Sequence, residues 1–388
     1  MTRARLTEAR ALALKAISLI LGVLVLCHVF RGLELQNSID RIRDMGPALA
    51  LAGLPFLAAT ALDTVAWRNL FPPGPIALRL STLWLLRSAS EAIHLALAGG
   101  VFLSEGVAPV VLRRRFSTPY SESLGAAWLR RILILRAQAF YLGAGLCLGF
   151  GMLRETVHRL GHDDTLVVGI LVVAPGLFAA SCVLVRVTTS ADLGFSSGPF
   201  PFRLPFRLPL RWPFRVGFRV PAGVRAQVES WEHRLRAVAE RLRTGSSTTR
   251  GHIRSTLMRR RTMLTSTALF FGAWTLEAIE TYFLLRLLGV DIDLFAVLAI
   301  EPSVTLVRHA AFFVPAGLGF QEAAYLLFLQ SPSLAIADPL STSAALSFLK
   351  RAKEALFIAV GLCILGCFFR SYSMKETTKE GAMESFNA

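Results

Sequence analysis

Long apolar runs constrain this chain more than any other feature of its sequence. A helix of about 20 apolar residues crosses the roughly 30 Å hydrocarbon core of a bilayer. Only 18% of the residues are charged and 54% are apolar, compared with about 25% charged in an average soluble domain, which excludes a soluble fold. The sequence therefore predicts an all-α polytopic membrane protein with about six full transmembrane helices. These helices are expected at Leu12–Phe30, Pro47–Trp67, Leu133–Leu153, Thr165–Arg186, Met263–Leu288 and Ala352–Phe369.

Two further apolar segments, 80–112 and 294–330, contain residues that break helices. The first has Gly99 and Gly100 near its middle and arginines at both of its ends. The second is interrupted by the run Pro315–Gly319. Non-helical backbone at membrane depth is tolerated only where protein or water forms hydrogen bonds with its polar groups. A pair of interrupted apolar segments, one in each half of the chain, therefore indicates a transporter binding site. We expect two broken or re-entrant helical hairpins that enter from opposite faces, as in an inverted repeat. The alternative is two ordinary hairpins with glycine-rich packing.

Basic residues divide the chain into two membrane halves. The formal net charge is +16, and fifteen arginines but only four acidic residues lie between Val187 and Arg261. Under the positive-inside rule this segment is cytoplasmic. No groove-reading motif accompanies the charge, so nucleic acid is not an expected partner. The predicted parts are an N-terminal transmembrane half at 1–187, an Arg/Pro-rich cytoplasmic loop at 188–262, a C-terminal transmembrane half at 263–370 and a cytoplasmic tail at 371–388.

The N-terminus has the basic and apolar parts of a secretory signal without its cleavage site. Four basic residues precede the apolar run Ala16–Phe30, and no small-residue site follows it. We therefore expect a retained first helix whose N-terminus is cytoplasmic. Together with the basic loop and the tail, this places both chain ends in the cytoplasm.

The Arg/Pro-rich loop contains a four-residue repeat over Pro199–Val220, beginning Pro-Phe-Arg-Leu. Proline at this frequency prevents helix and removes strand hydrogen-bond donors. Alternating arginine and aromatic side chains favour contact with anionic lipid headgroups. An unconstrained basic linker explains the same pattern equally well. The following segment Val224–Leu242 has the pattern of an amphipathic surface helix.

Ionisable side chains inside the apolar segments are the candidate functional residues, because each is costly at the bilayer centre unless it is paired or hydrated. Arg308 and Glu322 lie seven residues on either side of Pro315, so we expect them to pair across the second hairpin. The glycines after Pro315 would permit the helix break. Interhelical ion pairs with a purely structural role are the alternative. The candidates for substrate binding are Glu91, His94, Glu105, Glu277, Glu280, Glu301, Arg308, Pro315, Gly317, Gly319, Gln321, Glu322, Lys350 and Arg351.

Motifs for catalysis and for metal binding are absent from the sequence. It contains no metalloprotease, phosphate-loop, nucleophile-elbow or dinucleotide-binding motif. The five cysteines lie in apolar segments without metal-ligand spacing. We therefore expect neither a cofactor nor a metal, and no enzymatic activity.

The run from Arg308 to Glu322 resembles the signature of a known family. Its Phe-Phe-Val-Pro-Ala-Gly-Leu-Gly-Phe-Gln-Glu is similar to the pattern of hopanoid-biosynthesis-associated membrane proteins. That family belongs to the superfamily named after the transmembrane, flippase-like region of lysylphosphatidylglycerol synthase. The segment Ser90–His94 followed by Glu105 is similar to the family's first-half pattern, with His94 where the family has asparagine.

This resemblance implies lipid translocation without lipid synthesis, since no soluble aminoacyl-transferase domain follows Phe369. We expect a flippase or transporter of a bacterial inner membrane whose cargo is a polar-headed lipid of the hopanoid, phospholipid or glycolipid type. One alternative is an integral-membrane transferase that uses Glu91 or Glu322 as a base. Another is a scaffold that does not transport but recruits lipid-biosynthesis enzymes or anionic lipid.

Overall fold

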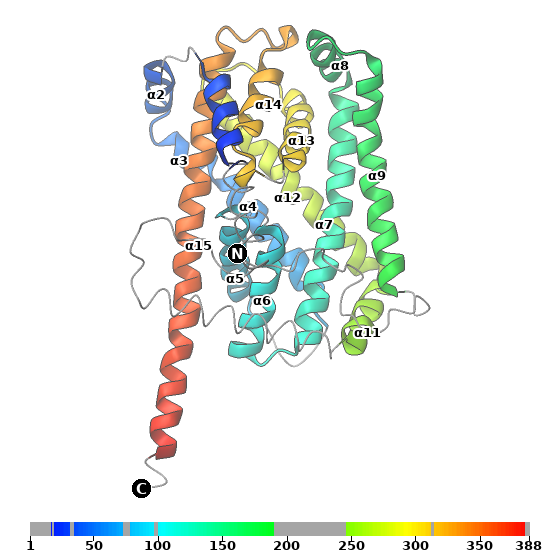
Figure 1. Cartoon of the computed structure of the whole chain (residues 1–388), viewed down its shortest axis with the longest axis vertical. Coiled ribbons are helices and arrows are strands. Elements are labelled where there is room, and N and C mark those ends of the chain that lie inside the picture. Colours follow the sequence, from blue (N-terminus) through cyan, green and yellow to red (C-terminus); the bar gives the residue numbers. More distant parts are fainter. Residues whose placement is uncertain are drawn as a thin grey trace, which may run out of the picture.

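The computed structural model describes residues 17, 19–31, 35–72, 78–96, 100–189, 246–311 and 314–384, and these form a helical bundle (Figure 1). No strand occurs among them, which confirms the predicted all-α polytopic fold class. The repeat Pro199–Val220 and the predicted surface helix Val224–Leu242 lie outside the described residues.

The helices are named here by their labels in Figure 1. The first helix, Leu19–Val29, has no label. The N-terminal half contains α2 (Leu35–Asp44), α3 (Ala48–Ala52), α4 (Leu54–Arg68), α5 (Leu80–Ala96), α6 (Gly100–Phe116), α7 (Tyr120–Leu148), α8 (Phe150–Arg159) and α9 (Asp164–Thr189). The C-terminal half contains α11 (Ser246–Leu257), α12 (Arg260–Leu287), α13 (Leu294–Ala310), η1 (Pro315–Gly317), α14 (Phe320–Leu329), η2 (Pro332–Leu334) and α15 (Pro339–Glu384).

Four helical stretches are long and apolar enough to cross a membrane in the described part of the chain: Ala48–Arg68, Tyr120–Leu148, Val167–Val185 and Arg260–Leu287. Each overlaps a predicted span. The first helix and α15 overlap the other two predicted spans, so the expected order of helices along the chain is present.

Two predicted helix starts are displaced, and buried charge explains both. The helix expected from Leu133 begins at Tyr120, and the one expected from Ala352 begins at Pro339. Arg130 in the first case and Lys350 in the second lower the local hydropathy. Both are nevertheless buried in ion pairs with other helices, so each helix continues through its charged turn.

Both predicted hairpins are present, and they enter the bundle from opposite ends. Figure 1 shows α5 and α6 in its lower half and α13 and α14 in its upper half. The helices α5, α6 and α13 have 17 residues each, and α14 has 10. At about 1.5 Å per residue, none of these arms matches the roughly 30 Å hydrocarbon core.

The break in the second hairpin is built from residues with left-handed backbone conformations. Ala316, Gly317 and Gly319 have φ angles of 51°, 63° and 81°. A Cβ atom on Gly319 would lie 2.4 Å from the backbone oxygen of Gly22 in the first helix. Glycine is therefore required at position 319 for two reasons: the left-handed backbone conformation and the close approach of the first helix.

A second close crossing joins the two halves, where α7 of the first half packs against α13 of the second. A Cβ atom on Gly145 would lie 2.2 Å from the Cγ atom of Pro302 and 2.9 Å from the carbonyl oxygen of Leu298. Small residues are favoured at such crossings because they let helix backbones approach.

We predict that Gly145→Ala lowers the free energy of unfolding by about 1–3 kcal/mol, because the added methyl group forces α7 and α13 apart. Unfolding by titration with SDS in mixed micelles measures this loss. The matched control is Gly143→Ala in the same helix, where the nearest atom is an ordinary contact at 3.7 Å. Equal stabilities for the two variants would contradict the tight crossing.

Candidate functional site

A cavity of about 610 Å³ lies inside the bundle, between the two hairpins. Its walls come from α4, α5, α6, α7 and α9 of the first half and from α12, α13, α14 and α15 of the second. Apolar side chains such as Phe56, Val173 and Trp274 line part of it, and the remainder is strongly charged. The charged lining residues are Asp63, Arg87, Glu91, Glu105, Arg130, Arg131, Glu277, Glu280, Glu301, Arg308, Lys350, Lys353 and Glu354.

In the first half, five of these residues form a continuous ionic network, which we call the first network. Asp63 on α4 lies at its centre and accepts from Arg87 at 2.9 Å. It also accepts two hydrogen bonds from Arg130, at 2.9 and 2.7 Å. Arg87 also pairs with Glu91 at 2.5 Å, and Arg130 pairs with Glu105 at 3.1 Å. The first network therefore ties α4, α5, α6 and α7 together at membrane depth.

The second half has its own set of ionic contacts, centred on Glu301 of α13. One carboxylate oxygen accepts from the Lys350 Nζ atom at 2.7 Å and from the Tyr325 hydroxyl at 2.6 Å. The Thr281 hydroxyl donates to the same oxygen. On the neighbouring turns, Lys353 donates to Glu280 at 2.6 Å. These contacts, which we call the second network, join α12, α13, α14 and α15.

Glu322 and Arg351 stabilise the helix break and do not line the cavity. One oxygen of Glu322 accepts from the Gly319 backbone N–H at 2.7 Å and so caps α14. The other accepts from the Arg351 Nε atom at 2.7 Å. A second nitrogen of Arg351 donates to the carbonyl oxygen of Ala316 at 3.0 Å. The pair therefore fixes the unusual backbone between α13 and α14.

The predicted ion pair between Arg308 and Glu322 is wrong. Both oxygens of Glu322 are already occupied by the cap and by Arg351, and its side chain is only 2% exposed. Arg308 instead pairs with Glu354 of α15 at 3.6 Å. The side chain of Arg308 packs beside Gly317. A Cβ atom added to Gly317 would lie 3.0 Å from the Arg308 Cγ atom.

The structure brings most of the predicted site residues to one place. Those that line the cavity are Glu91, His94, Glu105, Glu277, Glu280, Glu301, Arg308, Gly317, Gln321 and Lys350. Gly319, Glu322 and Arg351 lie outside the lining, and Pro315 begins η1 at the helix break. Their roles in binding substrate stay a prediction.

Sequence reasoning missed several charged residues of the cavity. Asp63 is a carboxylate inside a predicted transmembrane span, and that position alone was enough to mark it as a candidate. Arg130 and Arg131 fell outside the predicted site because the start of their helix was placed at Leu133. Lys353 lies one turn after the predicted residue Lys350, but nothing in the sequence showed that it faces the same cavity.

Within the described part of the chain, Glu277 and Arg131 are the two charged lining residues without an ion pair. Three buried polar atoms in the same lining also have no hydrogen-bond partner among the described residues: the His94 Nδ1, Gln321 Oε1 and Ser88 Oγ atoms. Buried polar groups are normally satisfied. The cavity therefore offers a polar ligand or water both charged side chains without an ion pair and polar atoms without a hydrogen bond to another described residue.

Among the described residues, no group of three or more histidine, cysteine, aspartate or glutamate side chains is arranged to hold a metal ion.

The sequence matches the family described as the lysylphosphatidylglycerol synthase TM region over residues 15–348. This match confirms the broader of the two resemblances drawn from the sequence, while the hopanoid-associated subfamily stays a prediction. No curated protein and no solved structure gives a significant match.

We predict that Glu301→Gln lowers the free energy of unfolding by about 3 kcal/mol, because it leaves the buried ammonium group of Lys350 without its counter-charge. The matched control is Glu277→Gln, which removes a carboxylate that has no ion pair with another described residue. Titration with SDS in mixed micelles compares the two variants. Equal losses would contradict the assignment of Glu301 as a paired structural charge and of Glu277 as an unpaired one.

Proposed function

Since the chain belongs to the lysylphosphatidylglycerol synthase TM region family, we propose that it is a flippase-like transporter that moves a polar-headed lipid across or out of a bacterial inner membrane. The lipid is translocated without a change in its covalent structure. The single observation that carries this proposal is the charged cavity, which lies at the meeting point of two hairpins that enter from opposite ends.

The cavity has the two properties that passage of a lipid headgroup requires. A headgroup that leaves water loses its hydration, and that loss is large unless protein groups replace the water. The unpaired Glu277 and Arg131 and the unsatisfied atoms nearby can replace it. Arg131 and His309 line the cavity and are exposed, so we propose that the headgroup enters beside them while the apolar part of the lipid stays in the bilayer.

The two broken hairpins supply the moving parts of the proposed mechanism. Each is shorter than the hydrocarbon core, and in the second the break is held by the contacts of Glu322 and Arg351. A rocking motion of one hairpin against the other would expose the cavity to one side and then to the other, as in transporters built from opposed repeats.

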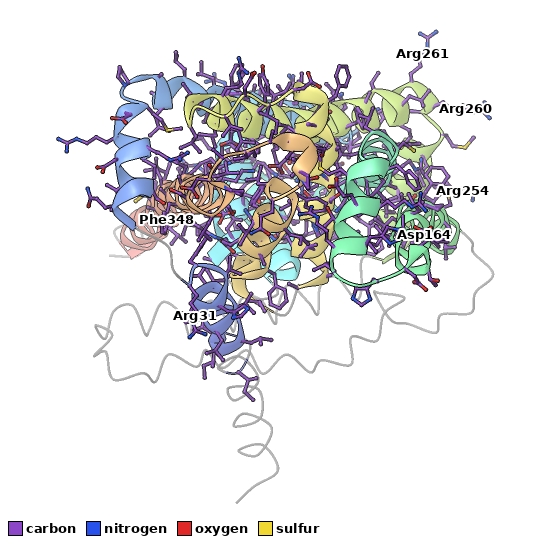
Figure 2. The ribbon with its side chains drawn as sticks, turned by 90° about the horizontal axis from the view of Figure 1, so that it is seen from above. Arg31, Asp164, Arg254, Arg260, Arg261 and Phe348 are labelled. Carbon is purple, nitrogen blue, oxygen red and sulfur yellow. The ribbon has the colours of Figure 1, made fainter. Side chains whose placement is uncertain are left out.

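Arginines concentrate at one end of the bundle, and we propose that this end faces the cytoplasm. They lie at the end of α6, along α11 and at the start of α12, the lower end in Figure 1. Figure 2 shows Arg261 projecting away from the ribbon. At the opposite end, basic and acidic residues mix, as in the pairing of Arg154 with Asp164 at 2.8 Å. The positive-inside rule favours this orientation. On the same reasoning, the repeat Pro199–Val220 would contact anionic headgroups.

We predict that Val173→Trp reduces lipid movement at least tenfold, because Val173 lines the cavity and the indole ring fills space that the headgroup needs. The assay measures loss of NBD-lipid fluorescence to dithionite in proteoliposomes. The matched control is Val172→Trp, one position away on the outer face of α9 and 59% exposed, which is expected to keep the wild-type rate.

Thr305→Trp fills the cavity from α13, so it provides a second variant if Val173→Trp does not fold. Full activity of a folded cavity-filling variant would contradict the proposed path. A lipid whose mass changes in vesicles with the purified protein would instead favour the transferase alternative.

We predict opposite accessibility for cysteines placed at the two ends of the bundle. In a variant that lacks the five native cysteines, His162→Cys in the turn after α8 should react with an impermeant maleimide in intact cells with a permeabilised outer membrane. Arg254→Cys on α11 should react only after the inner membrane is opened. Labelling in the reverse order would contradict the proposed orientation.

A further inference from the structure

One part of the cavity wall collects basic side chains from three helices. His94 comes from α5, Arg131 from α7, and Arg308 and His309 from α13. Both arginines are close enough to each of the two imidazoles to interact with them electrostatically. We call these four residues the basic cluster. Its members are far apart in the sequence, so only the folded bundle creates it.

Nearby carboxylates act on the basic cluster, but few of them pair with it. Glu105 and Glu91 interact electrostatically with Arg131, Glu91 with His94, and Glu277 with Arg308. Among the described residues, none of these three carboxylates forms an ion pair with a member of the cluster.

Arg131 has neither an ion pair nor a hydrogen bond with another described residue, and its side chain is exposed. Arg308 has one ion pair, a long one of 3.6 Å to Glu354. Glu354 in turn is held more closely by Arg351, at 2.7 Å. Elsewhere in the cavity, arginines and lysines have carboxylate partners at 2.5 to 3.1 Å.

The helix dipole favours the charge of Arg308 and His309 but not that of Arg131. Arg308 and His309 lie in the last turn of α13, where the helix dipole favours cations. Arg131 lies in the interior of α7, so it has no such compensation. Guanidinium groups stay charged in proteins, and like charges repel more strongly in a medium of low dielectric constant than in water. An anion bound at the basic cluster would offset this repulsion.

We propose that the basic cluster is a subsite for a phosphate-type anion, carried into the cavity as part of a lipid headgroup. This inference rests on the proposed function and narrows it, because it favours a phospholipid over a lipid whose headgroup is an uncharged polyol or sugar. Guanidinium groups match phosphate oxygens with paired hydrogen bonds. The unsatisfied Nδ1 atom of His94 supplies a further polar contact at the same wall.

The test uses the full chain in phosphatidylcholine vesicles that contain a trace of one acyl-NBD lipid. One set of vesicles carries NBD-phosphatidylglycerol, which has a phosphate, and the other carries NBD-glucosylceramide, which has none. We expect the protein to move the first lipid at least about tenfold faster than the second, since a hydrogen bond to a charged group contributes enough for that ratio. Arg131→Gln and Arg308→Gln should each lower the rate for the phosphate lipid about tenfold.

Three controls separate loss of the anion subsite from a general loss of charge or of folding. Arg131→Lys preserves the charge and should restore much of the rate. Arg136→Gln removes an arginine from the same helix, outside the cavity lining, where it contacts Phe178 and Ser181, and should leave the rate unchanged. Because Arg131 has no ion pair with another described residue, its replacement is not expected to unfold the protein, which size-exclusion chromatography checks.

Equal movement of both lipids, with wild-type rates in Arg131→Gln and Arg308→Gln, would overturn the anion subsite while leaving lipid transport intact. If the wild type moves neither lipid, the proposed function fails, and binding of inorganic phosphate to the purified protein decides the subsite separately. Phosphate binding that is lost in Arg131→Gln would support the subsite as a site for a free anion. No binding would overturn it.

Discussion

Pairing of buried charges is the constraint on which the rest of this structure depends. A charged side chain costs roughly 2.5–3.5 kcal/mol at the centre of a membrane helix, and this bundle contains many such side chains. The first network, centred on Asp63, and the second network, centred on Glu301, hold them in contact. Without these networks, helices as polar as α7 and α15 would not be stable inside a bilayer. Stability and a polar interior are therefore produced by the same residues.

Each network belongs to one half of the chain, and the cavity lies between them. The first network connects α4 to α7, and the second connects α12 to α15. Contacts between the halves are of several kinds: α4 packs along α12 and α5 along α15, Gly145 lies close against α13 and Gly319 against the first helix, and Arg41 pairs with Asp338 at 3.6 Å. The halves are therefore closely packed on one another, and residues of both line the charged cavity between the opposed hairpins.

The sequence predicted the elements of this fold that depend on hydropathy and on helix breakers. Apolar length identified the spans, and the run Pro315–Gly319 located the second break, which the positive φ angles of Ala316 and Gly319 confirm. Two helix starts were predicted too late, at Leu133 instead of Tyr120 and at Ala352 instead of Pro339, because a hydropathy scale gives a paired buried charge the same value as an exposed one. Ion-pair partners were the least predictable feature. The symmetric spacing of Arg308 and Glu322 suggested a pair, whereas the capping of Gly319 and the reach of Arg351 gave Glu322 other partners.

The acidic residues have different roles because their surroundings differ. Glu322 is buried and fixes backbone, Glu301 is buried and neutralises Lys350, and Glu277 lines the cavity without an ion pair to another described residue. Three glutamates of similar appearance in the sequence therefore have three different roles. Glu277 and Glu301 both line the cavity, but only Glu277 does so without an ion pair to another described residue, which the sequence alone did not distinguish.

The central claim is that this chain moves a lipid and does not modify it. Lipid analysis of separated inner and outer membranes and of their leaflets, from cells with and without the gene, tests it most directly. We predict an unchanged total amount of every lipid species, with one polar-headed species shifted between leaflets or membranes. A species that disappears from all fractions when the gene is removed would contradict the claim and indicate synthesis instead of transport.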